Sequence, residues 1–309
     1  MGTASFLKSA QALLRIRNQL VRECLAELLA VFVLILITLS GSAQMVTSSS
    51  TKGNFLTAYL AGALAVMVAI HTAGGVSGAH LNPAFSLAMC LLEQFPWWKF
   101  PIFVAVQTLG AFVSAGAVYA LYYDAIWHYS NGTLAASGPR ETASIFATYP
   151  ADYLSLSNGF LDQVMGTALL IVGILAILDT RNKAVPKGLE PVAVALLVFS
   201  IEVSMGSNCG CPMNPARDFG PRLFTFVAGW GVEVFRGNGW WWVPVVAPLL
   251  GATVGSALYQ LLVAFHHPAE EGDPPAEQNS VVLDNVAVPP DAKTSPGEKD
   301  TRGMLPQKK

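Results

Sequence analysis

Two copies of the tripeptide Asn-Pro-Ala are the residues whose types and positions point most directly to a chemical role. The copies are Asn82-Pro83-Ala84 and Asn214-Pro215-Ala216. Asparagine is a favoured helix N-cap, and proline is favoured at the first helical position because it lacks an N–H group that would go unpaired there. Each tripeptide therefore predicts a helix start, which carries about half a positive charge and presents the asparagine amide as a donor. Such a site donates to water or hydroxyl oxygens and repels cations.

The two predicted helix starts open short apolar segments, residues 80–92 and 214–228, which are too short to cross a bilayer alone. Amphipathic surface helices are the alternative interpretation, but both segments are short of the Lys and Arg that interfacial helices carry. Six longer apolar stretches qualify as transmembrane helices: residues 24–44, 56–74, 101–122, 159–179, 189–205 and 242–265.

The chain repeats this pattern internally. Each Asn-Pro-Ala follows two long apolar stretches, and an acidic residue lies early in the first stretch of each half. Glu27 lies 55 residues before Asn82, and Asp162 lies 52 residues before Asn214. Three stretches per half is an odd number, so the halves are inverted in the membrane and enclose a path at its midplane. We expect Glu27 and Asp162 to accept hydrogen bonds from the re-entrant backbone, which needs internal partners at that depth. A proton relay is the competing hypothesis, but few other ionisable residues line up with them.

Composition excludes several classes of protein. Apolar residues make up 53% of the chain and charged residues 12%, which argues against a soluble protein. The net charge of −2 gives no indication of a nucleic-acid partner. Cys209 and Cys211 are too closely spaced for the usual Cys-x-x-Cys metal or redox site. The sequence shows no catalytic triad or phosphate-binding loop, so we expect no enzyme activity, no cofactor and no metal.

The positive residues predict the orientation. With both termini cytoplasmic, the inner loops hold eight Lys and Arg residues and the outer loops hold five, two of which lie in a re-entrant segment. The same orientation places the sequon at Asn131 outside, as N-glycosylation requires. We expect a cytoplasmic segment at residues 1–21, a channel domain at 22–267 and a disordered cytoplasmic tail at 268–309. The repeats within the channel domain span about 22–122 and 159–267.

The chain resembles the aquaporins over roughly residues 15–267. The resemblance rests on residues 77–84 and 214–222, and Asp218 directly after Arg217 is typical of the aquaglyceroporin branch. Residues 188–190 and 239–242 are similar to vertebrate, intestinal-type members of that branch. The resemblance implies an all-α fold of six transmembrane helices and two re-entrant half-helices. It also implies a passive path for glycerol, water and other small neutral solutes such as urea, closed to protons and ions. Finally, it implies a homotetramer in the plasma membrane.

The resemblance also implies a selectivity constriction, formed by Gly62, Glu202, Cys211 and Arg217. Arg217 would donate to substrate hydroxyls, and the small Gly62 and Cys211 would leave the hole wide. Glu202 departs from the glycine expected there. It could pair with Arg217, narrow or plug the pore, attract cations, or turn away and leave permeation intact. A one-residue misalignment within the fifth stretch is the other explanation.

Two hypotheses concern single residues of the path. Cys211 at the constriction predicts block by mercurials. His80, with Glu27 close by, is a candidate pH-responsive inner gate, because histidine titrates near neutral pH; a structural histidine that tethers the loop is the alternative, and we favour it.

Two other functions stay open. A secondary transporter shares inverted repeats and broken helices but needs a coupling-ion site. A structural membrane protein with a pore closed by Glu202 is the second alternative.

Overall fold

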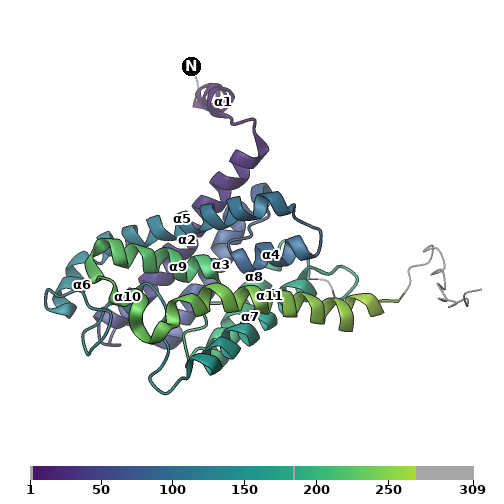
Figure 1. Cartoon of the computed structure of the whole chain (residues 1–309). Helices are drawn as coiled ribbons and strands as arrows, with labels where there is room; N and C mark the ends of the chain where they lie inside the picture. The colour runs from purple at the N-terminus through teal and green to yellow at the C-terminus, as the bar shows by residue number, and fades with distance from the viewer. Residues whose placement is uncertain (1–2, 184, 269–309) are drawn as a thin grey trace, which may run out of the picture. The chain divides into compact units, whose positions relative to one another are not determined.

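The computed structural model describes residues 3–183 and 185–268, and in these ranges every regular element is a helix. Six long helices and two half-helices confirm the expected fold class (Figure 1). The long helices are α2 (Gln19–Thr47), α3 (Phe55–Ser77), α5 (Phe100–Leu121), α7 (Leu156–Leu178), α8 (Glu190–Met205) and α11 (Val243–Leu262). The half-helices are α4 (Pro83–Leu91) and α9 (Pro215–Thr225).

Five of the long helices are long and apolar enough to span a membrane by themselves. The sixth, α8, has only 16 residues, so its length is about 24 Å at 1.5 Å per residue. After Met205 the chain leaves the helix through a run of turns and enters the second re-entrant loop. The short length of α8 therefore reflects the approach to the site.

The half-helices begin where the sequence predicts. Asn82 is the N-cap of α4 and Asn214 is the N-cap of α9, and both adopt an extended backbone conformation. Proline occupies the first turn of each helix. The side-chain oxygen of Asn82 accepts from Ala84 N at 2.8 Å, and that of Asn214 accepts from Ala216 N at 3.1 Å.

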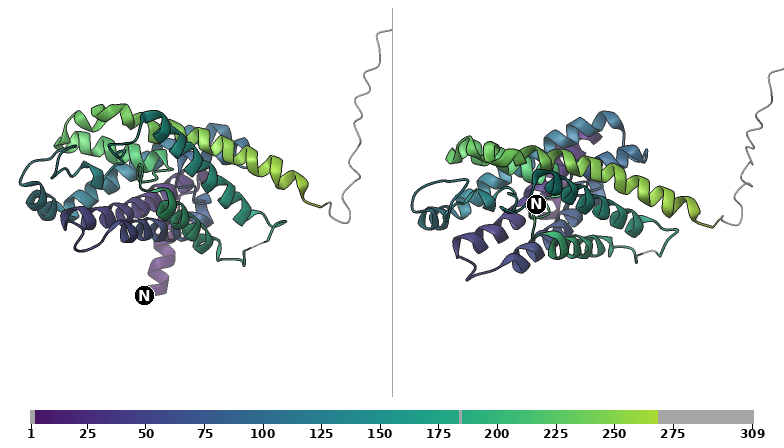
Figure 2. Two further views of the ribbon diagram at one scale, coloured as in Figure 1. Left: turned by 90° about the horizontal axis from the view of Figure 1, so that it is seen from below. Right: turned by 60° about the horizontal axis from the view of Figure 1, so that its bottom comes forward.

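The two halves interlock. Within the first half α2 packs on α3 and α5, and within the second half α7 packs on α8 and α11. Each half-helix also packs on a long helix of the other half, α4 on α11 and α9 on α5 (Figure 2). The α7–α11 contact needs glycine, because a Cβ at Gly251 would lie 2.6 Å from Val164 O and one at Gly255 would lie 2.5 Å from Ala168 O. The close-packing pattern of the last helix thus serves contacts within one chain.

Several short elements connect these helices. They are α6 (Tyr123–Ser130), α10 (Glu233–Arg236), η1 (Trp97–Lys99), η2 (Ala143–Ile145), η3 (Phe226–Trp230), η4 (Gly237–Trp242) and η5 (Ala264–His266). A further helix, α1 (Thr3–Leu14), lies in the N-terminal segment, for which the sequence analysis predicted no helix. The tail predicted to be disordered lies, from residue 269 on, outside the described residues.

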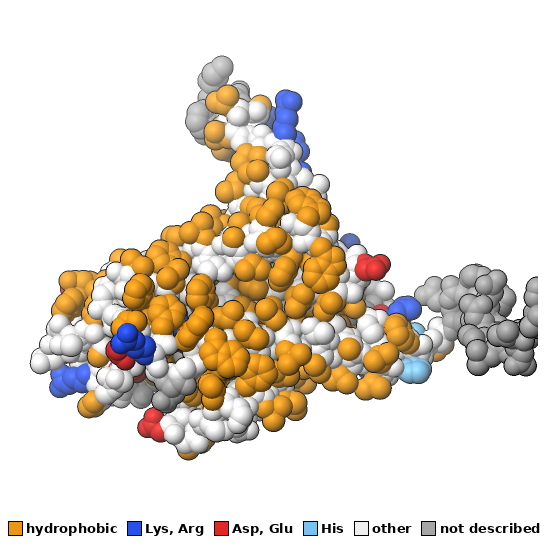
Figure 3. All heavy atoms as spheres, in the orientation of Figure 1, with side chains coloured by type: hydrophobic (Ala, Val, Ile, Leu, Met, Phe, Trp, Pro, Cys, Tyr) orange, Lys and Arg blue, Asp and Glu red, His pale blue; other side chains and the backbone are white. Residues whose placement is uncertain are grey.

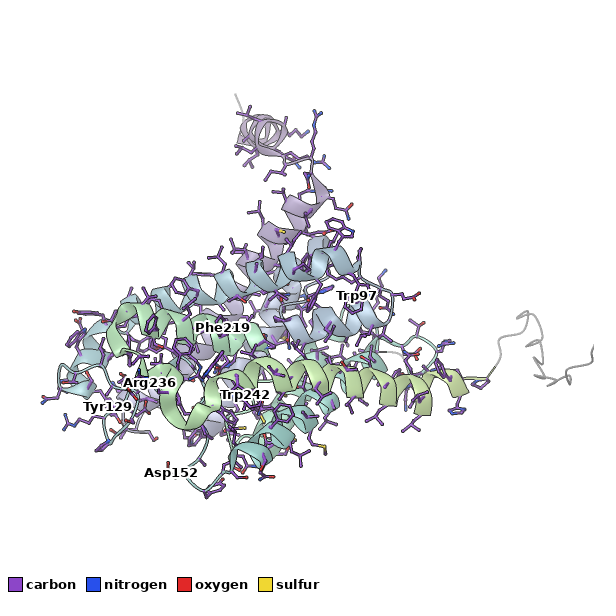
Figure 4. The ribbon with its side chains drawn as sticks, viewed as in Figure 1. Trp97, Tyr129, Asp152, Phe219, Arg236 and Trp242 are labelled. Carbon is purple, nitrogen blue, oxygen red and sulfur yellow. The ribbon has the colours of Figure 1, made fainter. Side chains whose placement is uncertain are left out.

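The surface and the ends of the bundle agree with a membrane-spanning protein. Large apolar side chains lie exposed along α3, α5, α7, α8 and α11, and apolar side chains dominate the face shown in Figure 3. Figure 4 shows Trp97 at one end of the bundle, with Tyr129 and Arg236 at the other. We call these the Trp97 end and the Tyr129 end.

Candidate functional site

Three cavities follow one another through the bundle. We name them by their order from the Trp97 end to the Tyr129 end. The inner cavity has a volume of about 330 Å³, the middle cavity about 80 Å³ and the outer cavity about 510 Å³. The inner and middle cavities share Asn82 and Asn214 in their walls. The middle and outer cavities share Glu202 and Arg217, and the outer cavity reaches Tyr129. The cavities therefore lie in series, with both Asn-Pro-Ala tripeptides where the first two meet.

The two N-cap asparagines bond to each other's loops. Asn82 Nδ2 donates to Met213 O at 2.9 Å, and Asn214 Nδ2 donates to Leu81 O at 2.9 Å. An amide NH₂ group has two N–H donors, so each asparagine retains one for the cavities that it lines. The starts of α4 and α9 thus meet amino terminus to amino terminus, and their partial positive charges add at this point.

The backbone before each asparagine has the same unusual shape in both halves. Ala79 and Leu81 have φ angles of 52° and 60°, and Cys211 and Met213 have φ angles of 46° and 45°. These residues occupy the third and first positions before Asn82 and Asn214. A left-handed conformation is costly for residues other than glycine and persists where neighbours hold it. The repeat is therefore present in the backbone conformation as well as in the sequence.

Glu27 holds the first loop as predicted. Its Oε1 accepts from His80 N at 2.8 Å and from Ser77 Oγ at 2.6 Å. Its Oε2 accepts from Leu81 N at 2.8 Å and from Gln107 Nε2 at 2.9 Å. The side chain is fully buried, and the four donors satisfy both of its oxygens.

The corresponding prediction for Asp162 was wrong. The donors to its carboxylate in the described residues are side chains: Asn208 Nδ2 at 2.8 Å, Cys209 Sγ at 3.1 Å and Gln163 Nε2 at 3.2 Å. The second loop is held instead by Gln163, whose Oε1 accepts from Met213 N at 3.3 Å. Gln163 is the next residue along α7 and is fully buried, so its side chain reaches the loop that Asp162 does not.

The middle cavity contains all four residues of the expected constriction: Gly62, Glu202, Cys211 and Arg217. Arg217 Nη1 donates to Phe146 O at 3.1 Å, and Arg217 N donates to Asn214 Oδ1 at 3.2 Å. Leu34, Val66 and Val198 supply apolar wall to the same cavity. The constriction thus combines cationic donors on one side with small and apolar groups on the others.

Within the described residues, Glu202 faces this cavity without an ion pair. No nitrogen of Arg217 lies within the 4.0 Å that defines a salt bridge from its carboxylate. Its Oε2 is buried and has no hydrogen-bond partner in the same part of the chain. A Cβ built on Gly62 would lie 3.3 Å from Glu202 Oε1, so the carboxylate fills the space that the glycine leaves.

Asp218 holds the outer loops in place. It forms a buried ion pair with Arg222 at 2.8 Å and accepts from Thr148 N at 2.7 Å. Arg222 also donates to Val234 O at 2.8 Å and to the carbonyl of Thr148. Thr148 lies two residues after Phe146, whose carbonyl binds Arg217. Asp218 therefore fixes the loop that orients the arginine of the constriction.

The His80 side chain lies in the wall of the inner cavity. Its Nδ1 lies 3.0 Å from Ser86 Oγ, and its ring packs against Phe85, Phe95 and Phe103. The bond to Glu27 comes from the backbone N–H of His80 and not from the ring.

The remaining candidate residues lie off the path or at its outer mouth. Asn131 is exposed and has a left-handed conformation at the end of α6, at the Tyr129 end. All four cysteines are free thiols. Cys209 lies in the wall of the outer cavity, whereas Cys90 packs in an apolar cluster within the bundle.

Several groups that hold the re-entrant loops and the constriction in place were not predicted from the sequence. Gln107 and Gln163 are fully buried polar side chains inside apolar helices, and a polar residue within a membrane span is a signal that could have found them. The carbonyls of Leu81, Phe146 and Met213 carry no such signal, because every residue type has a carbonyl.

The fold, the inverted half-helices and the three cavities in series are those of a multi-pass membrane channel. The major intrinsic protein family model matches residues 15–259, and the chain belongs to this family. Since members of the family are channels, the chain is a channel and not an enzyme.

Individual relatives agree with this assignment. The chain is 67% identical to Aquaporin-10 of Homo sapiens over 265 residues, which is 85% of this chain and 87% of that one. It is 48% identical to Aquaporin-9 of Homo sapiens over 88% of this chain and 92% of that one. Among solved structures it is similar to the aquaglyceroporin from Plasmodium falciparum, with a TM-score of 0.71 and 29% identity, covering 79% of this chain and 97% of that chain.

Proposed function

We propose that this protein conducts glycerol and water passively across the membrane, along the three cavities. The observation that carries the proposal is the middle cavity, where Arg217 faces small residues and an apolar wall. A polyol presents hydroxyls that accept from Arg217 and carbons that need apolar surface. The similarity to a solved aquaglyceroporin supports the same substrate class. Urea and other small neutral solutes fit the same description.

The same geometry supports the exclusion of protons and cations that we propose. The positive ends of α4 and α9 meet at the asparagine pair, and Arg217 adds a full charge at the constriction. Oriented dipoles and an arginine of this kind raise an electrostatic barrier to cations. Uphill uptake driven by an ion gradient would argue for a secondary transporter instead.

Stopped-flow light scattering on proteoliposomes tests the proposal, with water and glycerol gradients applied to the wild type and to Glu202→Gly. Fast glycerol flux in both proteins supports an open channel that tolerates the glutamate. Glycerol flux in neither protein, with water flux or none, contradicts the glycerol proposal.

A pore narrowed or closed by Glu202 is the second candidate function, and the unpartnered carboxylate in an 80 Å³ cavity favours it. A protein of this kind would serve a structural or conditionally gated role. Flux that appears only in Glu202→Gly would support it.

We infer that both termini are cytoplasmic in the plasma membrane, which would place the Tyr129 end outside. Exposed Asn131 at that end fits a glycosylation site, and loss of the glycan-dependent mobility shift in Asn131→Gln tests this. The family resemblance favours a homotetramer with one pore per chain, and native mass measurement in detergent tests the oligomeric state.

For His80 we propose the tethering role in preference to a pH gate. The contact with Ser86 and the three phenylalanine rings hold the imidazole in place. Glycerol flux that stays constant between about pH 5 and 8, the range in which histidine titrates, supports the tether. A change in flux that disappears in His80→Ala supports the gate.

A further inference from the structure

The N-terminal helix α1 has an apolar surface that the bundle does not cover. Leu7, Leu13 and Leu14 are 66%, 85% and 74% exposed. Leu7 and Leu14 lie two helical turns apart with Ala10 between them, so they share one face of the helix. An exposed leucine face of this kind needs an apolar partner outside the described bundle.

The same segment is strongly basic. Lys8, Arg15, Arg17 and Arg22 are exposed, and the sequence contains no Asp or Glu before Glu23. In Figure 3 the Lys and Arg side chains of the N-terminal segment gather on one side of it, and apolar side chains cover another. Lys8 lies in α1, and Arg15 and Arg17 follow within three residues of its end. An exposed leucine face with basic residues beside it is typical of segments that lie in a membrane interface.

The start of α2 lies at the level of that interface. Glu23 binds Lys99 with an N–O distance of 2.7 Å, which ties the first turns of α2 to the start of α5. Trp97 and Trp98, directly before α5, are 56% and 60% exposed. Tryptophan collects at the boundary between lipid tails and water. The residues that join α1 to α2 therefore emerge at the height of the lipid headgroups.

We propose that α1 is a lipid-binding element that lies on the membrane at the Trp97 end and binds anionic headgroups. The leucine face enters the acyl boundary, and the four basic side chains pair with lipid phosphates and carboxylates. Anionic lipid is the partner that satisfies both properties, since zwitterionic lipid presents no net negative charge to the basic residues. The inference goes beyond the channel function and requires only that the bundle sits in a bilayer.

Hydrogen–deuterium exchange on the full-length protein in nanodiscs tests this proposal. Nanodiscs of phosphatidylcholine alone are compared with nanodiscs that also contain phosphatidylserine, and both leaflets are anionic in the latter. We expect the amides of residues 3–14 to exchange about tenfold more slowly in the anionic nanodiscs, because each basic residue near such a surface contributes several-fold to binding. High salt should remove most of this difference.

Two variants and a matched control separate lipid binding from a structural effect. Lys8→Gln/Arg15→Gln/Arg17→Gln and Leu7→Ser/Leu14→Ser are both expected to lose the slow exchange. The matched control removes the same charge from exposed residues outside the N-terminal segment: Lys52→Gln/Arg140→Gln/Arg236→Gln. Residues 3–14 of this control should keep their slow exchange.

Equal exchange rates in the two lipids would overturn the proposal. So would protection that appears only when calcium-loaded calmodulin is added, since the partner would then be a protein. Glycerol flux in proteoliposomes is expected to survive both α1 variants, so a failure here is distinguishable from a failure of the channel proposal.

Discussion

Asn82 and Asn214 lie 132 positions apart in the sequence, yet each donates a 2.9 Å hydrogen bond to the carbonyl that directly precedes the other. The pair joins the starts of α4 and α9 and so fixes the geometry of the path. Each asparagine combines an N-capping oxygen with an N–H donor to the opposite loop.

Asn82→Asp separates these two roles. Aspartate retains the capping oxygen but loses the donor to Met213 O and places a negative charge beside that carbonyl. We expect glycerol and water flux to fall at least about tenfold, and the loss of a buried hydrogen bond to cost roughly 1–3 kcal/mol of stability. Flux is measured in proteoliposomes and Tm by differential scanning fluorimetry.

Asn54→Asp is the matched control. Asn54 caps α3 through its side-chain oxygen, which accepts from Thr57 N, and it lies at the protein surface. Aspartate caps equally well there, so flux and Tm should stay near those of the wild type. A similar small effect of both substitutions would show that the bond between the loops is not needed.

The sequence predicts this part of the molecule well because the information is local. Asparagine followed by proline specifies a helix start whatever the surroundings, and apolar runs of about 20 residues specify spans. The fold class and the lining of the middle cavity follow from these signals and from the family resemblance. The short length of α8 also follows, since the apolar stretch 189–205 nearly matches Glu190–Met205. The helix at residues 3–14 does not, since it is too short for a span.

The supporting contacts could not be assigned from sequence. Asp162 and Gln163 are neighbours on α7, and a helix separates their side chains by about 100°. Which one reaches Met213 N depends on the rotation of α7, so the acidic residue was the wrong choice. Phe146 holds Arg217 through its carbonyl, and only the fold brings that loop to the constriction.

Glu202→Gln is expected to stabilise the protein. Within the described residues the carboxyl group has a buried oxygen without a hydrogen-bond partner. Burial of such a group is costly whether it stays charged or takes up a proton to become neutral, and an amide of nearly the same size avoids that cost. We expect a higher Tm, which corresponds to a gain of roughly 1–3 kcal/mol in the free energy of unfolding. Glycerol flux should stay within about twofold of that of the wild type, because glutamine keeps the width of the constriction.

Glu190→Gln is the control for that substitution. Glu190 also lies in the wall of a cavity, but its Oε2 accepts from Gly188 N at 2.6 Å. Glu190→Gln should therefore leave the Tm unchanged or lower it. A Tm that falls in Glu202→Gln would mean that the carboxylate has a partner after all, for example Arg217 through water.

Asp218→Asn should destabilise the outer end of the channel. The substitution leaves Arg222 as a buried charge without a counter-ion, and breaking a buried pair in this way costs about 3–5 kcal/mol. Thermal unfolding in detergent measures the loss. Glu233→Gln, which breaks an exposed pair with Arg236 at 3.6 Å, should cost no more than about 1 kcal/mol. Equal effects of the two would refute the anchoring role of Asp218.

Cys211 should make the channel sensitive to mercurials. Cys211 lies in the wall of the middle cavity, the smallest of the three, so a mercury adduct there would fill much of that cavity. We expect block of both water and glycerol flux in the wild type and resistance in Cys211→Ser. Cys90→Ser, away from the cavities, should remain sensitive. Resistance in Cys209→Ser instead would place the target in the outer cavity.

Asp179 should make the Trp97 end of the bundle sensitive to acid. It lies just beyond the end of α7 and accepts from His267 Nε2 at 2.8 Å, Arg181 N at 2.9 Å and Tyr259 Oη at 3.0 Å. Burial would raise the pKa of this carboxyl, but the hydrogen bonds from His267, Arg181 and Tyr259 outweigh it and lower the pKa below 3.8. A lowered pKa means that the contact stabilises the folded protein above pH 3.8 and that this contribution is lost as the pH falls through the folded-state pKa.

Asp179→Asn should therefore have a lower Tm than the wild type at pH 6. The difference should shrink as the solution is acidified below the ordinary carboxyl pKa of 3.8 and vanish below the folded-state pKa. Scanning fluorimetry across that pH range measures the Tm of the wild type and of Asp179→Asn. Asp152→Asn, an exposed aspartate in the loop before α7, should show no difference at either pH. A Tm difference that grows on acidification would reverse the sign of the linkage and show that the contact favours protonated Asp179. Because the bond from Tyr259 joins the end of α7 to α11, its loss should loosen the contact between these two helices at the Trp97 end before the asparagine pair is disturbed.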